Sequence, residues 1–303
     1  MNWYKEDRDA WKQIIETVAA EEHRSVQMVE KDTIQSFFLL NLSRYDLPFV
    51  FKGGTSLSKA YNLIDRFSED IDLSADRKLS EAERRKVKEV ILEIADGLGF
   101  RLTNPDNVMS RHSYNKYVFE YDSLFSDTPL ETIVETSFYQ SVYPVEEHEV
   151  YSFVGRFCQE RNIVLPVPFE ASTANMKVQS LERTFIDKVF AICDYRLQDM
   201  EDRDSRHLYD IAKILPEIRI DDDLKALVDK VRADRMASKN NPSAQPEHNI
   251  PEMLKEIISS RFIYEPDYNN LTRKLLYEDV SYNEAVNNGV AVIADLDLFE
   301  YRT

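Results

Sequence analysis

The spacing of apolar residues along the first sixty positions predicts helices and one short strand. Apolar side chains recur three and four positions apart in residues 11–18 and again in residues 34–42, as on one face of a helix. Phe49-Val50-Phe51 is a run of strand-forming residues that ends at Gly53-Gly54. Residues 55–63 then predict another helix. This last stretch is typical of a strand, a glycine turn and a helix.

The middle of the chain alternates apolar and polar residues in several short runs. Asp70-Ile71-Asp72-Leu73 predicts a second strand, and residues 99–102 predict the start of another. Between them, residues 80–97 are highly charged but place Val and Ile at helical spacing, which predicts a surface helix. Residues 114–121 and 131–139 alternate on either side of a turn, so we expect an antiparallel hairpin.

The strand signals fade near residue 165, and the remaining sequence predicts helices. Helix starts are expected at Ser180, Ser205, Asp222 and Pro251. The whole pattern predicts the α+β class, with a mixed sheet and flanking helices in residues 1–165. Residues 166–303 are expected to form a helical domain.

Composition narrows the class of protein further. The chain has 303 residues, 43% of them hydrophobic, and a formal net charge of −17, so we expect a folded protein that needs a local basic patch to bind nucleic acid. It lacks a signal-like start and any run of about 18 apolar residues, so a cytoplasmic location without a membrane is expected. Cys158 and Cys193 are expected to be reduced and buried.

The glycine pair is the first candidate for chemistry. Glycines after a strand allow a positive φ, and the start of the following helix presents backbone N–H groups to a phosphate. Gly53, Gly54, Thr55 and Ser56 are therefore candidate nucleotide-binding residues, the last two through their hydroxyls. The alternative is an ordinary structural turn, which a glycine pair alone predicts at least as well.

The Asp-x-Asp strand is the second candidate. Residues two apart in a strand point to the same side, so Asp70 and Asp72 would place two carboxylates together. Such carboxylates repel each other unless a cation lies between them. Mg²⁺, with Mn²⁺ as an alternative, prefers carboxylate and phosphate oxygens and can assist transfer to phosphorus. A solvated strand end is the alternative interpretation.

Taken together, these two segments resemble the nucleotidyltransferase superfamily. Lys52-Gly53-Gly54-Thr55-Ser56-Leu57-Ser58-Lys59 and Arg66-Phe67-Ser68-Glu69-Asp70-Ile71-Asp72-Leu73 are similar in particular to the AbiEii/AbiGii toxins. The resemblance implies a nucleotidyltransferase fold in which the helical domain of residues 166–303 completes the active cleft. It implies an enzyme that transfers a nucleoside monophosphate from an NTP to an acceptor hydroxyl. It also implies the toxin of a bacterial toxin–antitoxin or phage-defence system, with RNA such as tRNA as acceptor and a cognate antitoxin as partner.

A later part of the chain adds candidates through the same resemblance. The family's second motif matches Lys188, implied to contact nucleotide phosphates, and Asp210, implied to orient Lys188 or to activate the acceptor hydroxyl. Many members of the superfamily have a third metal-binding carboxylate, for which Glu135 is the counterpart. The alternatives are a lysine at the edge of the core for Lys188, an exposed helix face that pairs with Arg206 and Lys213 for Asp210, and a solvent-facing Glu135. Lys59 and Arg66 are further basic residues that could contact the triphosphate or the acceptor.

Two other functions fit the same residues. A nucleotide-binding regulator would keep the fold and bind nucleotide with metal but release no pyrophosphate. An antibiotic-modifying nucleotidyltransferase would act on a small molecule, and the acidic composition favours cationic substrates over RNA. The sequence therefore predicts a nucleotidyltransferase, with these two readings as alternatives.

Overall fold

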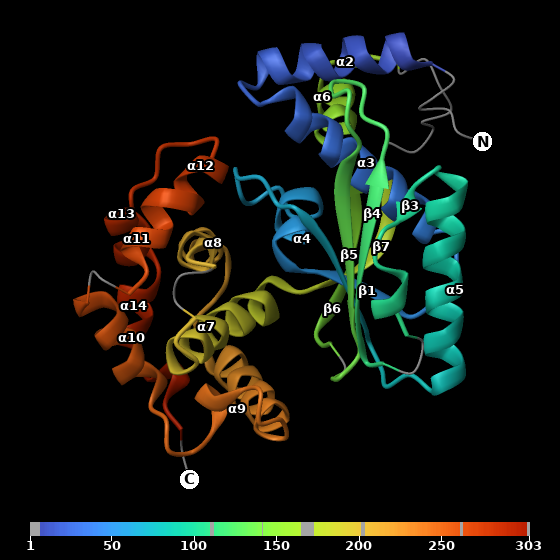
Figure 1. The fold of residues 1–303 in the computed structure, drawn as a ribbon. Coiled ribbons are helices and arrows are strands. Elements are labelled where there is room, and N and C mark those ends of the chain that lie inside the picture. The colour runs from blue at the N-terminus through green and yellow to red at the C-terminus, as the bar shows by residue number, and fades with distance from the viewer. Residues whose placement is uncertain are drawn as a thin grey trace. The chain divides into compact units, whose positions relative to one another are not determined.

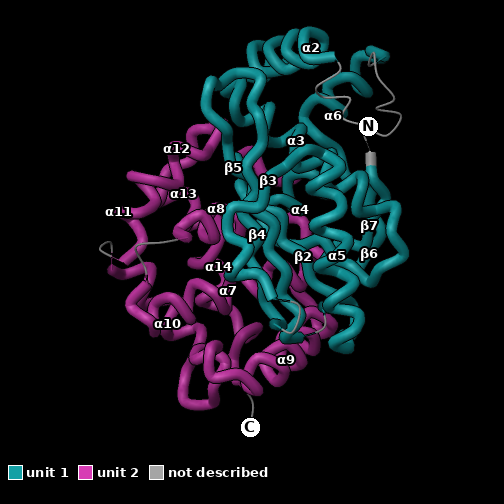
Figure 2. The backbone as a smooth tube through the Cα atoms, turned by 45° about the vertical axis from the view of Figure 1, so that its right-hand side comes forward, with its two compact units in different colours: residues 1–62, 67–179 teal, residues 63–66, 180–303 magenta. Residues whose placement is uncertain are grey.

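The computed structural model describes residues 7–109, 112–140, 142–164, 173–200, 204–260 and 263–301. The chain forms two compact units, the first from Met1–Asn62 and Phe67–Gln179 and the second from Leu63–Arg66 and Ser180–Thr303 (Figure 2). The predicted boundary at residue 165 lies outside the described residues. Among the described helices, none combines the length and apolar character needed to cross a bilayer.

The first unit is built on a mixed sheet of seven strands in the order β3-β4-β5-β2-β1-β7-β6 (Figure 1). The strands are β1 (Phe49–Lys52), β2 (Asp70–Ala75), β3 (Arg101–Leu102), β4 (Tyr114–Tyr121), β5 (Leu130–Ser137), β6 (Val145–Tyr151) and β7 (Thr173–Gln179). β2 pairs with β5 and β1 with β7 in parallel. The other neighbours are antiparallel.

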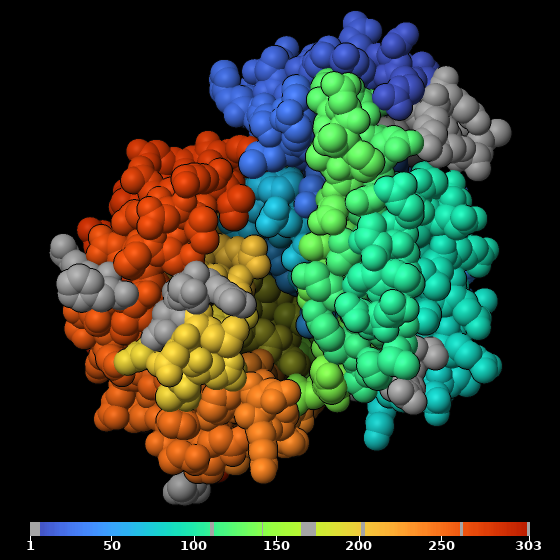
Figure 3. Space-filling model, in the orientation of Figure 1, coloured from blue at the N-terminus to red at the C-terminus, as the bar shows by residue number. Residues whose placement is uncertain are grey.

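Helices pack against this sheet and close the core of the first unit. They are α2 (Arg8–Glu21), α3 (Val26–Leu42), α4 (Gly53–Lys59), α5 (Glu81–Gly97), η1 (Pro105–Asn107) and α6 (Phe153–Glu160). Phe38 of α3 and Val90 of α5 belong to one apolar cluster with Phe119 and Val134 of the sheet. Figure 3 shows α5 and the β4–β5 region packed side by side.

The two faces of the sheet differ in chemistry. In β2, Ile71 and Leu73 are fully buried, whereas Asp70 and Asp72 are partly exposed. β4 and β5 alternate in the same way, with Tyr117, Phe119 and Val134 buried in the core and Val118 and Ile133 half-buried on the other face. Because paired residues on neighbouring strands share a face, the polar side chains of β2, β4 and β5 gather on the opposite face.

The second unit is helical. Its elements are α7 (Leu181–Leu197), α8 (Arg206–Ile214), η2 (Leu215–Glu217), α9 (Asp222–Met236), η3 (Pro242–Ala244), α10 (Ile250–Ser259), α11 (Glu265–Asp267), η4 (Tyr268–Thr272), α12 (Arg273–Leu275), α13 (Tyr282–Asn288), α14 (Val290–Ala294) and η5 (Asp297–Phe299). Phe185 of α7, Ile211 of α8 and Ile293 of α14 are fully buried in it. The Ser180 side chain caps α7 by accepting a hydrogen bond from Arg183 N.

The predicted α+β class is confirmed, and so are the hairpin of β4 and β5 and the helices that begin near residues 180, 205, 222 and 251. The expectation that strands end before residue 165 is wrong, because β7 follows that point and joins the sheet beside β1. Ala174, Met176 and Val178 of β7 alternate with polar residues and are buried. The alternation is thus present in the sequence, but it lies beyond the point near residue 165 where the strand signals fade.

Candidate active site

The glycine turn brings the backbone against the Asp-x-Asp strand. Gly53 has a φ of 80°, a conformation that L side chains rarely adopt. A Cβ atom built on Gly53 would lie 2.1 Å from Asp72 Oδ2. Gly54 lies inside α4 and is not among the described glycines with positive φ. Gly53 therefore combines a positive φ with a close approach of its backbone to Asp72. Of the two glycines, it is Gly53 whose backbone conformation requires a glycine.

The hydroxyls of Thr55 and Ser56 hold the turn in place. Thr55 Oγ1 donates a hydrogen bond to Asp70 O at 2.5 Å and lies 2.9 Å from Ser68 Oγ. Ser56 Oγ donates to Gly53 O at 2.9 Å. Both side chains are buried. Each hydroxyl thus donates to a backbone oxygen in this structure, and the binding of a phosphate by these two residues stays a prediction.

The candidate carboxylates lie in a row of charged residues across four neighbouring strands. Lys52 of β1 pairs with Asp72 of β2, Asp72 pairs with Glu135 of β5, and Glu135 pairs with Lys116 of β4. Asp70 lies two residues before Asp72 in the same strand and shares its face. The sheet therefore gathers Asp70, Asp72 and Glu135 on one face, with a lysine at either end of the row.

Glu135 already has a cationic partner. Its Oε1 lies 3.2 Å from Lys116 Nζ. Burial and the adjacent Glu135 carboxylate raise the pKa of Tyr114, and Asp72 and Asp70 raise it further, so all three carboxylates act on this phenol. As the side chains stand, no three His, Cys, Asp or Glu residues in the described ranges are close enough together to hold a metal ion. The pair of aspartates is the donor set that this face offers.

Lys59, four residues after Thr55, is buried and forms an ion pair in the interior of the first unit. Its ammonium pairs with the Asp32 carboxylate of α3 and also donates to Ser36 Oγ at 2.7 Å. Asp32 accepts a further hydrogen bond from Phe153 N at 2.7 Å. Burial lowers the pKa of Lys59, and the Asp32 carboxylate opposes that shift. Lys59 therefore fixes α4 against α3 and α6, and the expectation that it contacts a triphosphate is wrong.

The second unit contains a buried cluster around Asp210 of α8. Asp210 is fully buried, and its two oxygens accept hydrogen bonds from Arg66 Nε and Nη2, each at 2.7 Å. Lys188 Nζ of α7 lies 2.7 Å from Asp210 Oδ2. Arg66 and Lys188 are themselves only 2% and 6% exposed. The structure thus brings together three residues that lie far apart in the sequence.

This cluster excludes the simpler interpretations of Lys188 and Asp210. Asp210 does not lie on a solvated helix face, because Arg206 pairs with Asp204 and Lys213 pairs with Glu278. Lys188 is not a lysine that extends to solvent from the core edge, because its ammonium is buried against a carboxylate. Arg66, like Lys59, holds an aspartate within its own unit.

The protonation states follow from the same contacts. Burial alone would raise the pKa of Asp210, but the charges of Arg66 and Lys188 outweigh it and hold that pKa well below its usual range. Burial lowers the pKa of Lys188, and the Asp210 carboxylate opposes this. With Asp210 ionised and both cations charged, the cluster carries one net positive charge. A buried positive charge of this kind favours an anionic ligand such as a phosphate.

Sequence reasoning missed two side chains that contact the candidate residues. Lys116 is paired with Glu135, and the alternation in β4 could have placed it on the face of Tyr114. His207 lies three residues before Asp210 in α8, hence on the same side of that helix, and its Nδ1 lies 3.3 Å from Lys188 Nζ. Neither contact could be found from spacing alone, because each also depends on a partner in another element.

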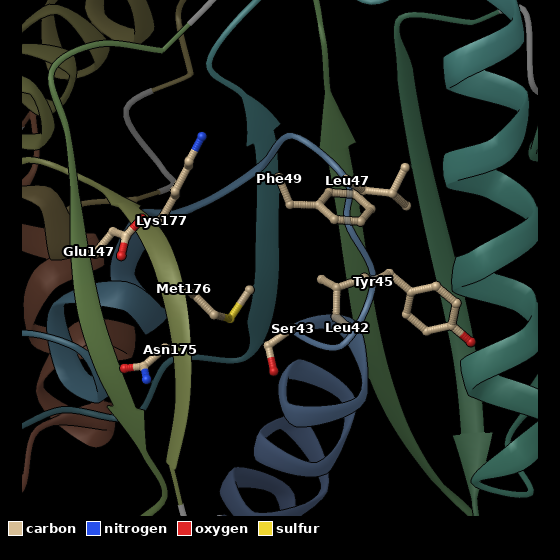
Figure 4. Close-up of a pocket in the computed structure, with 9 residues that line it drawn as sticks. All are labelled: Leu42, Ser43, Tyr45, Leu47, Phe49, Glu147, Asn175, Met176 and Lys177. Atoms are coloured by element: carbon tan, nitrogen blue, oxygen red, sulfur yellow. The ribbon is translucent and has the colours of Figure 1, made fainter.

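A separate hollow of about 160 Å³ lies in the first unit, where α3 ends beside β1 and β7 (Figure 4). It is lined by Leu42, Ser43, Tyr45, Leu47, Phe49, Glu147, Asn175, Met176 and Lys177. None of the candidate site residues lines it. Lys177 of this hollow is engaged by Asp76 at 2.6 Å. The hollow therefore does not contribute to the candidate active site.

Comparison with known proteins identifies the family. Residues 38–288 match the model of the family described as nucleotidyl transferase AbiEii toxin, type IV TA system. The solved structures include JHP933 from Helicobacter pylori, with 16% identity, a TM-score of 0.47 and coverage of 91% of this chain and 93% of that one. They also include a candidate nucleotidyltransferase from H. pylori, with 15% identity, a TM-score of 0.47 and coverage of 91% and 96%. No curated protein matches the chain. Because the family match spans most of the sequence, the chain belongs to the AbiEii nucleotidyl transferase toxins of type IV toxin–antitoxin systems.

Proposed function

We propose that this toxin transfers a nucleoside monophosphate from an NTP to a hydroxyl of an RNA such as tRNA. The observation that carries the proposal is the approach of Gly53 to Asp72, with Asp70 on the same strand face. A side chain at position 53 would fill this space, so the turn is built around the carboxylate. Two carboxylates beside a glycine turn are the donors and the open backbone that a metal-bound triphosphate requires.

The donor set fits a divalent metal. Asp70 and Asp72 would hold Mg²⁺ or Mn²⁺, and Glu135 would join them only by releasing Lys116. When bound, the metal supplies positive charge that offsets the charge on the transferring phosphoryl group. Gly53 and Gly54 leave room for the phosphates, while Thr55 and Ser56 keep the turn in its shape through their bonds to Asp70 O and Gly53 O.

Lys188 and Asp210, both in the second unit, are the remaining candidates. We assign to Lys188 the binding of a phosphate oxygen through its ammonium. Both oxygens of Asp210 are occupied by Arg66 and Lys188, which favours a role in orienting Lys188 over activation of the acceptor hydroxyl. The acceptor oxygen attacks the α-phosphorus and pyrophosphate leaves. Rate enhancement would come chiefly from positioning and from stabilised charge.

The test uses each labelled NTP with Mg²⁺, total bacterial RNA and the full chain, followed by separation of RNA, protein and small molecules. Asp70→Asn and Asp72→Asn should each lower transfer by more than about a hundredfold, because each removes a charged metal ligand. Asp76→Asn is the matched control, since Asp76 follows the same strand but pairs with Lys177. Unchanged transfer in either site variant would reject the assignment.

The same experiment decides between this function and its alternatives. Label in a small molecule instead of RNA would indicate an antibiotic-modifying enzyme, which the net charge of −17 favours for cationic substrates. Nucleotide binding without pyrophosphate release would indicate a regulator. A direct complex with a cognate antitoxin would be detected separately by co-purification of the two proteins.

A further inference from the structure

The contacts of Lys188 use two of the three N–H donors of its ammonium group. A lysine ammonium has three N–H donors and no acceptor. One points to Asp210 Oδ2 at 2.7 Å, and a second lies 3.3 Å from His207 Nδ1. Among the described residues no third acceptor of Lys188 occurs. Two fixed bonds therefore determine the direction of the remaining N–H.

The contact with Lys188 determines which ring nitrogen of His207 carries the proton. An ammonium can only donate, so Nδ1 of His207 must be the acceptor, and the ring proton of a neutral imidazole must lie on Nε2. Burial and the adjacent Lys188 charge hold the pKa of His207 well below its usual range, Arg206 and Arg66 lower it further, and Asp210 opposes the shift. His207 is therefore neutral beside Lys188 at neutral pH.

The orientation of the His207 ring is fixed by its surroundings. The ring stacks on Tyr195 of α7 with 6.0 Å between centroids and 13° between planes. At the start of α8, His207 N donates to Asp204 O at 2.9 Å, which anchors the backbone. Helix α8 also carries Asp210, so the two acceptors of Lys188 come from one rigid element. A ring held in this way presents Nδ1 in one direction.

We propose that His207 is a positioning residue, whose Nδ1 accepts a hydrogen bond from Lys188 and, together with Asp210, aims the third ammonium N–H at a nucleotide phosphate. This inference rests on the proposed function, in which Lys188 binds the phosphate. A neutral acceptor suits this role better than a second carboxylate, because it orients the ammonium without cancelling the positive charge that Arg66, Lys188 and Asp210 leave. His207 itself touches no reacting atom.

Two substitutions separate this role from simple packing. In His207→Asn the side-chain oxygen takes nearly the place of Nδ1 and can still accept from Lys188. In His207→Gln the polar end extends to the place of Nε2, so the acceptor is misplaced although the residue is larger and equally polar. We expect His207→Gln to lower kcat by about tenfold to a hundredfold, as loss of a hydrogen bond to a charged group implies. His207→Asn should recover most of that loss.

A spectroscopic measurement on the unsubstituted chain tests the same contact without catalysis. With ¹⁵N-labelled histidine, the His207 signals, identified by their absence in His207→Asn, should show a neutral ring with the proton on Nε2 at pH 7. Lys188→Met should shift the Nδ1 signal, because it removes the donor. A proton on Nδ1, or a signal that Lys188→Met leaves in place, would overturn the inference.

The outcomes distinguish this inference from the proposed function. If Lys188→Met transfers nucleotide at the parent rate, the function assigned to Lys188 fails. If Lys188→Met is inactive while His207→Asn and His207→Gln have equal kcat and equal melting temperatures, only the role of His207 fails. Should His207→Gln lose its fold, the tautomer measured in the parent chain still decides.

Discussion

Replacing Gly53 with alanine tests the geometry on which the proposed metal site depends. The φ of 80° at Gly53 costs an alanine about 1–2 kcal/mol. The added Cβ would lie 2.1 Å from Asp72 Oδ2 and 2.9 Å from Asp72 Cγ. A contact of that length cannot persist, so the carboxylate must move by about 1 Å, a displacement that can lower a rate by about a hundredfold.

The assay compares Gly53→Ala with Gly97→Ala. Position 97 ends α5, and a Cβ there would meet nothing within 4 Å, so this variant should keep full activity. Gly53→Ala should lower the melting temperature by a few degrees, on the order of 2–4 °C per kcal/mol for a unit of this size. It should also weaken Mn²⁺ binding and lower nucleotide transfer by about a hundredfold. Parent-like metal affinity and transfer in Gly53→Ala would refute the reasoning.

Further predictions concern the carboxylates and their partners. Lys188→Met should abolish transfer and also destabilise the protein by about 1–3 kcal/mol in urea unfolding, because Asp210 would keep only Arg66 as its cation; parent-like transfer would contradict this. The pKa of Asp210 is depressed in the folded state, so its stabilisation is complete above the unfolded pKa near 3.8 and is lost as the pH falls below it; Asp210→Asn should lose less stability than the parent between about pH 4 and pH 2. Glu135→Gln should weaken Mn²⁺ binding less than Asp72→Asn does, since Lys116 holds Glu135; equal weakening would make Glu135 a metal ligand.

Local patterns in the sequence were enough to predict the fold class and the first half of the candidate site. The alternation in residues 70–73 places Asp70 and Asp72 on one face without any knowledge of the partner strands. Likewise the sequence showed a turn at the glycine pair, but which glycine has the positive φ depends on how the turn meets Asp72, and this was decided by packing.

The rest of the site depends on contacts between distant segments. Arg66 and Asp210 are 144 positions apart, and no periodicity links residues at that separation. The ion pair of Lys59 with Asp32 likewise depends on where α4 meets α3. A buried lysine or arginine has the same local sequence context as an exposed one. Spacing therefore identified which residues carry charge but not which charges are buried together.

The four residues Leu63–Arg66 belong to the second unit although they precede most of the first in the chain. Besides the Arg66 pair with Asp210, Asp65 N donates a hydrogen bond to Tyr209 Oη at 2.9 Å, and Tyr277 N donates to Asp65 O. A fragment that begins at Ser180 would therefore lack the arginine that neutralises its buried aspartate. A continuous piece that contains all of the second unit must therefore also contain most of the first.

The position of Leu63–Arg66 within the sequence of the first unit also determines the order in which the two units can be completed during synthesis. At about 5–20 residues per second, a ribosome needs on the order of 7–30 s after Arg66 to produce Asp210, 144 residues later. The sheet of the first unit can form in that interval, because β7 ends at Gln179. The helices around Asp210 are completed only afterwards, and they then pack around Leu63–Arg66, which has already been synthesised. Translation would thus yield the folded sheet of the first unit before the lysine that we assign to the phosphate has its final partners.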